Sequence, residues 1–156
     1  MNTMKKVSYL AVITAAFAAL VEGAAWYSPV LFGNAWTELR HLQPATMAEM
    51  KTPVWEMLAE FVRSLVVAYV LARLVVSTGV VGWKGAVQLA FWLWLGFQAM
   101  AIAGSVIHEN YPWQLYAIHA GDALAKTLVM AVILGLWRKR SPSVAEASVR
   151  RGNGQD

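Results

Sequence analysis

The feature that most constrains this chain is a set of four long apolar stretches, at residues 7–27, 53–76, 83–107 and 113–137. The hydrocarbon core of a bilayer is about 30 Å thick, and an α-helix crosses it with about 20 apolar residues. Each stretch is therefore long enough to span a membrane. Because 58% of the residues are hydrophobic and only 14% are charged, we predict an all-α polytopic membrane protein. It would have four transmembrane helices in one domain over residues 1–138.

Lysine and arginine predict how these helices are oriented. Lys5 and Lys6 precede the first stretch, Arg73 and Lys84 bracket the second connection, and residues 138–140 are all basic. The third connection has no lysine or arginine. Because basic residues favour the cytoplasmic side, both termini are predicted to be cytoplasmic. The formal charge of +4 then reflects topology and gives no reason to expect a nucleic-acid partner.

The two ends of the chain allow other interpretations. The start MNTMKK, followed by an apolar run, is also typical of a secretory signal peptide. The apolar run continues through WYSPVLF, which favours a transmembrane helix. Residues 139–156 lack apolar periodicity, which predicts a disordered basic cytoplasmic tail. Its arginines are suited to anionic lipid headgroups, although a solvated topology signal is the simpler interpretation.

The first connection, at about residues 29–52, is amphipathic. Its segment LFGNAWTELRHL predicts a short helix in the outer membrane interface. The residues predicted to face lipid are Leu31, Phe32, Trp36 and Leu39. Thr46 and Glu49 have the spacing of a capping box for the second transmembrane helix, and Pro53 is placed to kink its first turns.

Small residues predict where the helices pack closely, because helices in lipid gain packing energy mainly from close approach. In the first helix, Ala15, Ala19 and Gly23 recur at four-residue spacing. The fourth helix has a second set, opposite its polar face: Ala117, Gly121, Ala131 and Gly135.

Every predicted transmembrane helix also carries polar groups at a similar depth. They are Glu22 in the first helix, Glu60 and Arg63 in the second, Gln98 in the third, and His119, Asp122 and Lys126 in the fourth. At 1.5 Å per residue, the shallower members lie roughly 8–14 Å from the outer ends of their helices. We therefore predict one polar layer in the outer half of the membrane and treat it as a candidate binding site.

Charge in this layer must be compensated. A charged side chain at the bilayer centre costs about 2.5–3.5 kcal/mol, so these groups should face inward and pair. The candidate pairs are Glu60 or Asp122 with Arg63, and Asp122 or Glu22 with Lys126. Three acids and two bases leave one acid in excess, and a buried, unpaired carboxyl group tends to hold a proton near neutral pH.

Three functions are compatible with such a layer. A hydrated layer suits a small proton-linked transporter or channel-like protein, which with four helices per chain would be expected to act as a homo-oligomer. A dry, fully paired layer suits a non-catalytic scaffold or accessory subunit, whose polar contacts tie helices together. An intramembrane enzyme is least supported, because the sequence has no HExxH motif, serine elbow or phosphate-binding glycine loop.

We predict no catalytic residue, no metal and no cofactor. The chain has no cysteine, so a thiolate metal site and a cysteine nucleophile are excluded. His119 is the one histidine in the predicted layer, and a lone histidine with carboxylates is a weak metal set.

The stretch GAAWYSPVLFGNAW, residues 23–36, resembles the membrane family called domain of unknown function 1761. SLVVAYVLARL and AVILGLWR are also similar to family segments, so the resemblance extends nearly to Trp137. The positions that match the family motif are Trp26, Tyr27, Ser28, Pro29, Gly33 and Trp36. The resemblance implies four helices, a bacterial cytoplasmic membrane and no established activity. Family members usually carry asparagine near His119 and aromatic or histidine residues near Asp122. Asp122 and Lys126 therefore look like departures that serve either this protein's own function or its packing.

Overall fold

The computed structural model describes residues 7–40 and 54–137, and within them the regular structure is helical, without a strand. The elements are α1 (Tyr9–Trp26), α2 (Gly33–Leu39), α4 (Val54–Ser77), α5 (Trp83–Leu93), the π-helical turn η1 (Trp94–Ala99), α6 (Met100–His108) and α7 (Trp113–Trp137). α5, η1 and α6 form one continuous helix. The predicted capping residues Thr46 and Glu49, Pro53 and the tail 139–156 lie outside the described residues.

Three of these helices are long and apolar enough to cross a membrane, judged by length and composition: α1, the helix Trp83–His108, and α7. α4 has 24 residues and stands where the second of the four transmembrane helices, at residues 53–76, was predicted. It is less apolar than the others because it carries Glu56, Glu60, Arg63 and Arg73. The role of α4 therefore depends on where those charges lie.

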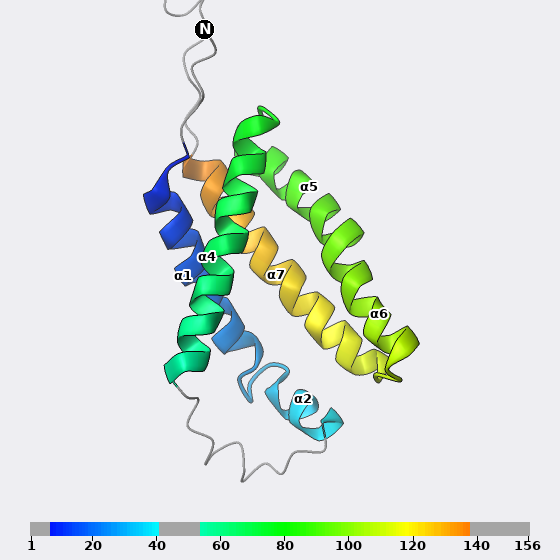
Figure 1. Ribbon diagram of the computed structural model, residues 1–156. Helices are drawn as coiled ribbons and strands as arrows, with labels where there is room; N and C mark the ends of the chain where they lie inside the picture. The colour runs from blue at the N-terminus through cyan, green and yellow to red at the C-terminus, as the bar shows by residue number, and fades with distance from the viewer. Residues whose placement is uncertain (1–6, 41–53, 138–156) are drawn as a thin grey trace, which may run out of the picture.

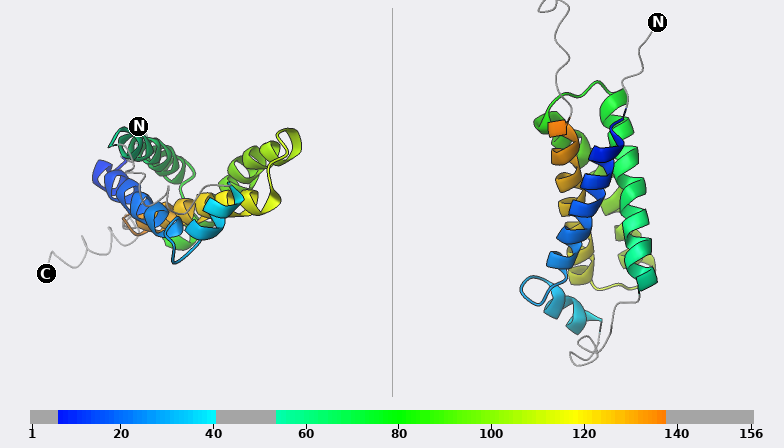
Figure 2. Two further views of the ribbon diagram at one scale, coloured as in Figure 1. Left: turned by 90° about the horizontal axis from the view of Figure 1, so that it is seen from below. Right: turned by 90° about the vertical axis from the view of Figure 1, so that its left-hand side faces the viewer.

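α7 is the central helix. It packs against α1 and α5, and α1 also packs along α4. α4 and α5 are joined by the connection 78–82 and then diverge, so that α4 and α6 are separated at the opposite end (Figure 1). Seen along the bundle, α4 and α6 rise from the two sides of a floor formed by α1 and α7 (Figure 2, left). We call the divergent end, where α2 lies, the α2 end, and the other, where α1 begins and α7 ends, the terminal end.

The core toward the terminal end is made of small side chains from four helices. Its alanines, each at most 5% exposed, are Ala11, Ala15, Ala16, Ala19, Ala68, Ala72, Ala86, Ala90 and Ala131. A Cβ added at Gly135 would lie 2.6 Å from the Cα of Trp83, so glycine lets α5 begin directly against α7. The predicted close packing is therefore present, except at Ala117, which is exposed on a face of α7 that no described helix covers.

α2 is a helix of 7 residues, shorter than the predicted amphipathic segment. Leu31 and Phe32 before it are exposed, at 53% and 39%. Trp36, which was predicted to face lipid, is half-buried. Its ring packs edge-on against Tyr27, with the ring centroids 5.6 Å apart, because the turn before α2 folds this helix back onto the end of α1.

Candidate functional site

Four charged side chains from α4 and α7 form a connected network. Lys126 Nζ lies 3.0 Å from the Asp122 carboxylate, one turn earlier on α7, and 3.4 Å from Glu60 Oε1 on α4. Arg63 holds the same glutamate, because its Nε and Nη2 donate to the two carboxylate oxygens at 2.8 and 2.5 Å. Charge therefore alternates along Arg63, Glu60, Lys126 and Asp122, and each base has an acidic partner.

The network runs from an exposed end to a buried end. The side chains of Arg63 and Glu60 are 59% and 33% exposed, whereas those of Lys126 and Asp122 are each 11% exposed. The sequence suggested both the Glu60–Arg63 and the Asp122–Lys126 pairs. Its alternatives, Asp122 with Arg63 and Glu22 with Lys126, form no ion pair within the described residues.

Lys126 passes α1 at Gly23. A Cβ at that position would lie 2.8 Å from both Cε and Nζ of the lysine, so glycine leaves the room that the lysine needs. The neighbouring Glu22 is half-buried, and its Oε2 has no hydrogen-bond partner in the described part of the chain. Asp122 Oδ1 is also buried without a hydrogen bond. It lies 3.0 Å from Lys126 Nζ, but Oδ2 is the oxygen that accepts from the lysine.

Gln98 joins the layer through a π-helical turn that the sequence pattern did not predict. η1 interrupts the third long helix for six residues, and such turns are frequent at functional sites. Gln98 Oε1 lies 3.1 Å from Thr127 Oγ1, which donates to Ala123 O at 2.6 Å. Since a hydroxyl has only one proton, the amide nitrogen of Gln98 is the better assignment for the atom that faces Thr127. Trp94, at the start of η1, donates from Nε1 to Ala120 O at 2.8 Å.

His119 lies between two tyrosines on the α2 side of the network. Its Nδ1 is 2.8 Å from Tyr27 Oη and its Nε2 is 3.5 Å from Tyr111 Oη. Burial, together with the charge of the nearby Asp122 carboxylate and a hydrogen bond to it, raises the pKa of Tyr27, so this phenol keeps its proton and donates it either to that carboxylate or to Nδ1. An imidazole that accepts at Nδ1 carries its proton on Nε2, the nitrogen that faces Tyr111.

The motif residues of the first connection form the tight turn that positions Tyr27. The Gly33 N–H donates to Ser28 O at 3.0 Å, and the Asn34 side chain donates to Pro29 O at 3.2 Å. A Cβ at Gly33 would collide with the carbonyl oxygen of Tyr27. The turn therefore closes this tightly only with glycine at position 33.

Two tryptophans of the motif fix this turn in place. Trp26 Nε1 donates to Ile118 O on α7 at 3.2 Å. The Trp26 ring covers Gly121, where a Cβ would lie 2.8 Å from the ring atom Cζ2. Trp36 packs against the ring of Tyr27. The motif thus has a structural role with a consequence for the site, because it holds the tyrosine hydroxyl on the imidazole.

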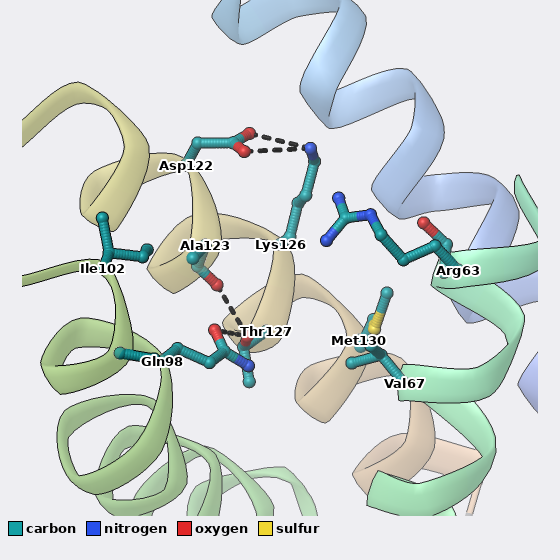
Figure 3. A pocket seen from close by; sticks show the side chains of 11 residues that line it. Arg63, Val67, Gln98, Ile102, Asp122, Ala123, Lys126, Thr127 and Met130 are labelled. Atoms are coloured by element: carbon teal, nitrogen blue, oxygen red, sulfur yellow. Dashed lines mark hydrogen bonds and ion pairs between the residues drawn. The ribbon is translucent and has the colours of Figure 1, made fainter. Parts of the chain in front are cut away.

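A cavity of about 280 Å³ lies against the charged network, between α4, α7 and the segment of η1 and α6 (Figure 3). Its polar lining comprises Arg63, Ser64, Gln98, Asp122, Lys126 and Thr127, and its apolar lining includes Val67, Ile102 and Met130. The cavity continues into a wider space of about 600 Å³ that reaches Tyr27, Glu109 and Tyr111 at the α2 end. In the other direction it stops at Met130, which is 2% exposed and belongs to the alanine-rich core.

Some residues of the site were not predicted. Thr127 had only a weak signal: it is a polar residue in an apolar helix, but it lies about 100° around the helix from Lys126. No sequence signal indicated Tyr111 or Trp94. Tyr111 belongs to a loop, and the placement of Trp94 depends on η1. Within residues 7–40 and 54–137, no group of three or more histidine or acidic side chains is placed to hold a metal ion.

Comparisons with curated proteins and with solved structures returned no match. A protein-family model does match, over residues 10–135, a range that contains the charged network, the cavity and the turn motif. That family is described as a protein of unknown function (DUF1761), which agrees with the resemblance carried by GAAWYSPVLFGNAW. Because the match covers well over half of the chain, the protein belongs to the DUF1761 family.

Proposed function

We propose that α4 is a fourth transmembrane helix and that both termini are cytoplasmic, in the cytoplasmic membrane of a bacterium. At 1.5 Å per residue, 24 residues extend about 36 Å, which is enough to cross the hydrocarbon core. The central charges of α4 support this proposal because Glu60 and Arg63 belong to the network with α7. Glu56 lies in its first turn and Arg73 near its other end, where charged side chains reach the headgroups.

The protein would then be a small proton-linked transporter or channel-like protein that admits a small solute from the outer side. The observation that carries this proposal is the cavity beside the network, which opens at the α2 end and stops at the alanine-rich core. A cavity lined by Arg63, Asp122 and Lys126 is stable at membrane depth when water or a polar solute fills it. Closure toward one side of the membrane, here at Met130 and the alanine-rich core, is what an alternating-access mechanism requires of each of its states.

The size of the cavity limits the solute. Its deep part, about 280 Å³, is close to the lower end of the range for ligand pockets, about 300–1,000 Å³. One side of it is polar, and the other is formed by aliphatic side chains and a methionine. We therefore expect a small polar or amphipathic solute.

A membrane scaffold or accessory subunit is the second candidate, and the pairing of the charges favours it. Each base in the network has an acidic partner, and Lys126 and Asp122 are nearly buried. Such a layer would tie α4 to α7 without binding a solute. The two candidates differ in whether water reaches the cavity.

Cysteine accessibility separates these candidates, because the chain has no cysteine of its own. The test variant is Ala123→Cys, at a position that lines the cavity. The controls are Ala131→Cys in the alanine core, where the native residue is 0% exposed, and Val66→Cys on the outer surface of α4, where it is 58% exposed. A thiol reacts as the thiolate, so a charged, membrane-impermeant maleimide labels only positions that water reaches.

In intact cells, the transporter proposal predicts labelling of Ala123→Cys from outside and no labelling of the core and lipid-facing controls. If folded Ala123→Cys resists labelling from both sides, the cavity is dry and the scaffold becomes the better description. If it reacts only when the reagent reaches the cytoplasmic side, the proposed orientation is wrong.

A further inference from the structure

Two buried carboxylate oxygens in this protein form no hydrogen bond of good geometry. They are Glu22 Oε2 on α1 and Asp122 Oδ1 on α7, and neither has a hydrogen-bond partner among the described residues, although Asp122 Oδ1 also lies 3.0 Å from Lys126 Nζ in an ion pair. Buried polar atoms are rarely left in this state, so each case requires an explanation. A proton bound between the two oxygens would provide the missing hydrogen bond.

The two acids belong to the same contact between α1 and α7. A Cβ at Gly23, next to Glu22 in the chain, would lie 4.0 Å from Asp122 Oδ1 and 2.8 Å from Lys126 Nζ. The small side chains of α1 allow this close approach.

The charge balance around these acids points the same way. The titratable and charged groups facing them are Tyr27 after α1, Glu60 and Arg63 on α4, and His119 and Lys126 on α7. Arg63 and Lys126 compensate two of the three carboxylates, through Glu60 and Asp122. The remaining carboxylate, Glu22, has no ion-pair partner within the described chain. One bound proton makes the layer electrically neutral.

We propose that Glu22 and Asp122 share one proton. The carboxylic acid of Glu22 donates its O–H to Asp122 Oδ1, while Asp122 Oδ2 keeps its hydrogen bond from Lys126. This inference rests on the proposed function and identifies the group that binds the coupled proton. Because Asp122 also lines the cavity, the proton has a route to solvent through that carboxylate. Loss of the shared proton leaves one net negative charge beside Lys126.

Infrared spectroscopy of the purified full-length protein in nanodiscs tests this directly, because a protonated carboxyl group has a carbonyl stretch that a carboxylate lacks. Difference spectra would be recorded between neutral and alkaline pH. The variants are Glu22→Gln and Asp122→Asn, with Glu56→Gln as the matched control, because Glu56 is exposed in the first turn of α4. The amide of Glu22→Gln can donate to Asp122 as the acid does, so this variant should fold.

We expect a protonated-carboxyl band in the wild type that disappears at alkaline pH. The band should be absent from Glu22→Gln, shifted in frequency in Asp122→Asn, and unchanged in Glu56→Gln. A wild type without the band, a band that survives Glu22→Gln, or a band that Asp122→Asn leaves unshifted would each overturn the proposal. If Glu22→Gln does not fold, the frequency of the band in Asp122→Asn still decides the outcome. The infrared band and the cysteine labelling are independent measurements. If labelling shows a hydrated cavity but the band is absent, the shared proton is ruled out and the proposed transport function still stands.

Discussion

Replacing Lys126 by methionine should destabilise the protein much more than replacing Arg63 by methionine. The Lys126 side chain is 11% exposed and lies 3.0 and 3.4 Å from two carboxylates. Removing one partner of a buried ion pair leaves a charge uncompensated and costs about 3–5 kcal/mol. The Arg63 side chain is 59% exposed and pairs within its own helix, an arrangement worth about 0–1 kcal/mol. Methionine keeps most of the length of the lysine, so packing over Gly23 changes little.

The free energy of unfolding would be measured in mixed micelles, with circular dichroism following helix loss as denaturing detergent is added. A double variant, Asp122→Asn with Lys126→Met, removes both charges of the buried pair. It should be more stable than the sum of the two single losses predicts, by the coupling of about 0.5–3 kcal/mol expected for residues in contact.

Two results would refute this reasoning. Equal losses for Lys126→Met and Arg63→Met would mean that the two ends of the network do not differ in burial. Strict additivity in the double variant would mean that Asp122 and Lys126 are not paired in the folded protein.

Further predictions concern packing and hydrogen bonds. Gly135→Ala should lower the melting temperature, because a Cβ there would lie 2.6 Å from a backbone atom of Trp83 and such overpacking costs about 1–3 kcal/mol. The control is Gly104→Ala, where a Cβ would meet no atom within 4 Å; this variant should be neutral or stabilising. Trp94→Phe should lower the free energy of unfolding by about 0.5–1.5 kcal/mol, because it removes the 2.8 Å hydrogen bond to Ala120 O. Trp92→Phe, at a side chain that is 61% exposed, should lower it less in the same unfolding assay. Tyr27→Phe removes the 2.8 Å contact with the imidazole and should shift the histidine ring resonances in NMR spectra; unchanged resonances would show that the contact is absent in solution.

Much of the architecture could be predicted because it depends on local properties of the chain. The lengths of α1, the helix Trp83–His108 and α7 follow from uninterrupted apolar stretches. The fixed rise of a helix also predicted that Glu60 and Lys126 lie at a similar level of their helices, and the two side chains do meet. The family was also recognisable from the turn motif, whose glycine and tryptophans have backbone and packing roles that few other residues could fill.

The placement of individual side chains could be predicted less well. Trp36 was expected in lipid and packs on Tyr27, because an amphipathic pattern does not show which neighbour covers the apolar face. η1 had no signal in the sequence, since a π turn differs from an α-helix by a small change in backbone hydrogen bonding. Tyr111 joins His119 through a loop, whose path depends on the two helices that it connects.

By itself the sequence determined that the chain forms long apolar helices with charged groups at similar positions along them, because helix length and rise per residue are local quantities. Only the tertiary structure decided which charges meet. The choice of Glu60 as the second partner of Lys126, and the space that Gly23 leaves for that lysine, depend on helix rotation and crossing. The cavity likewise exists because α4 and α6 diverge from the connection 78–82, and that angle is set by packing between helices that are far apart in the sequence.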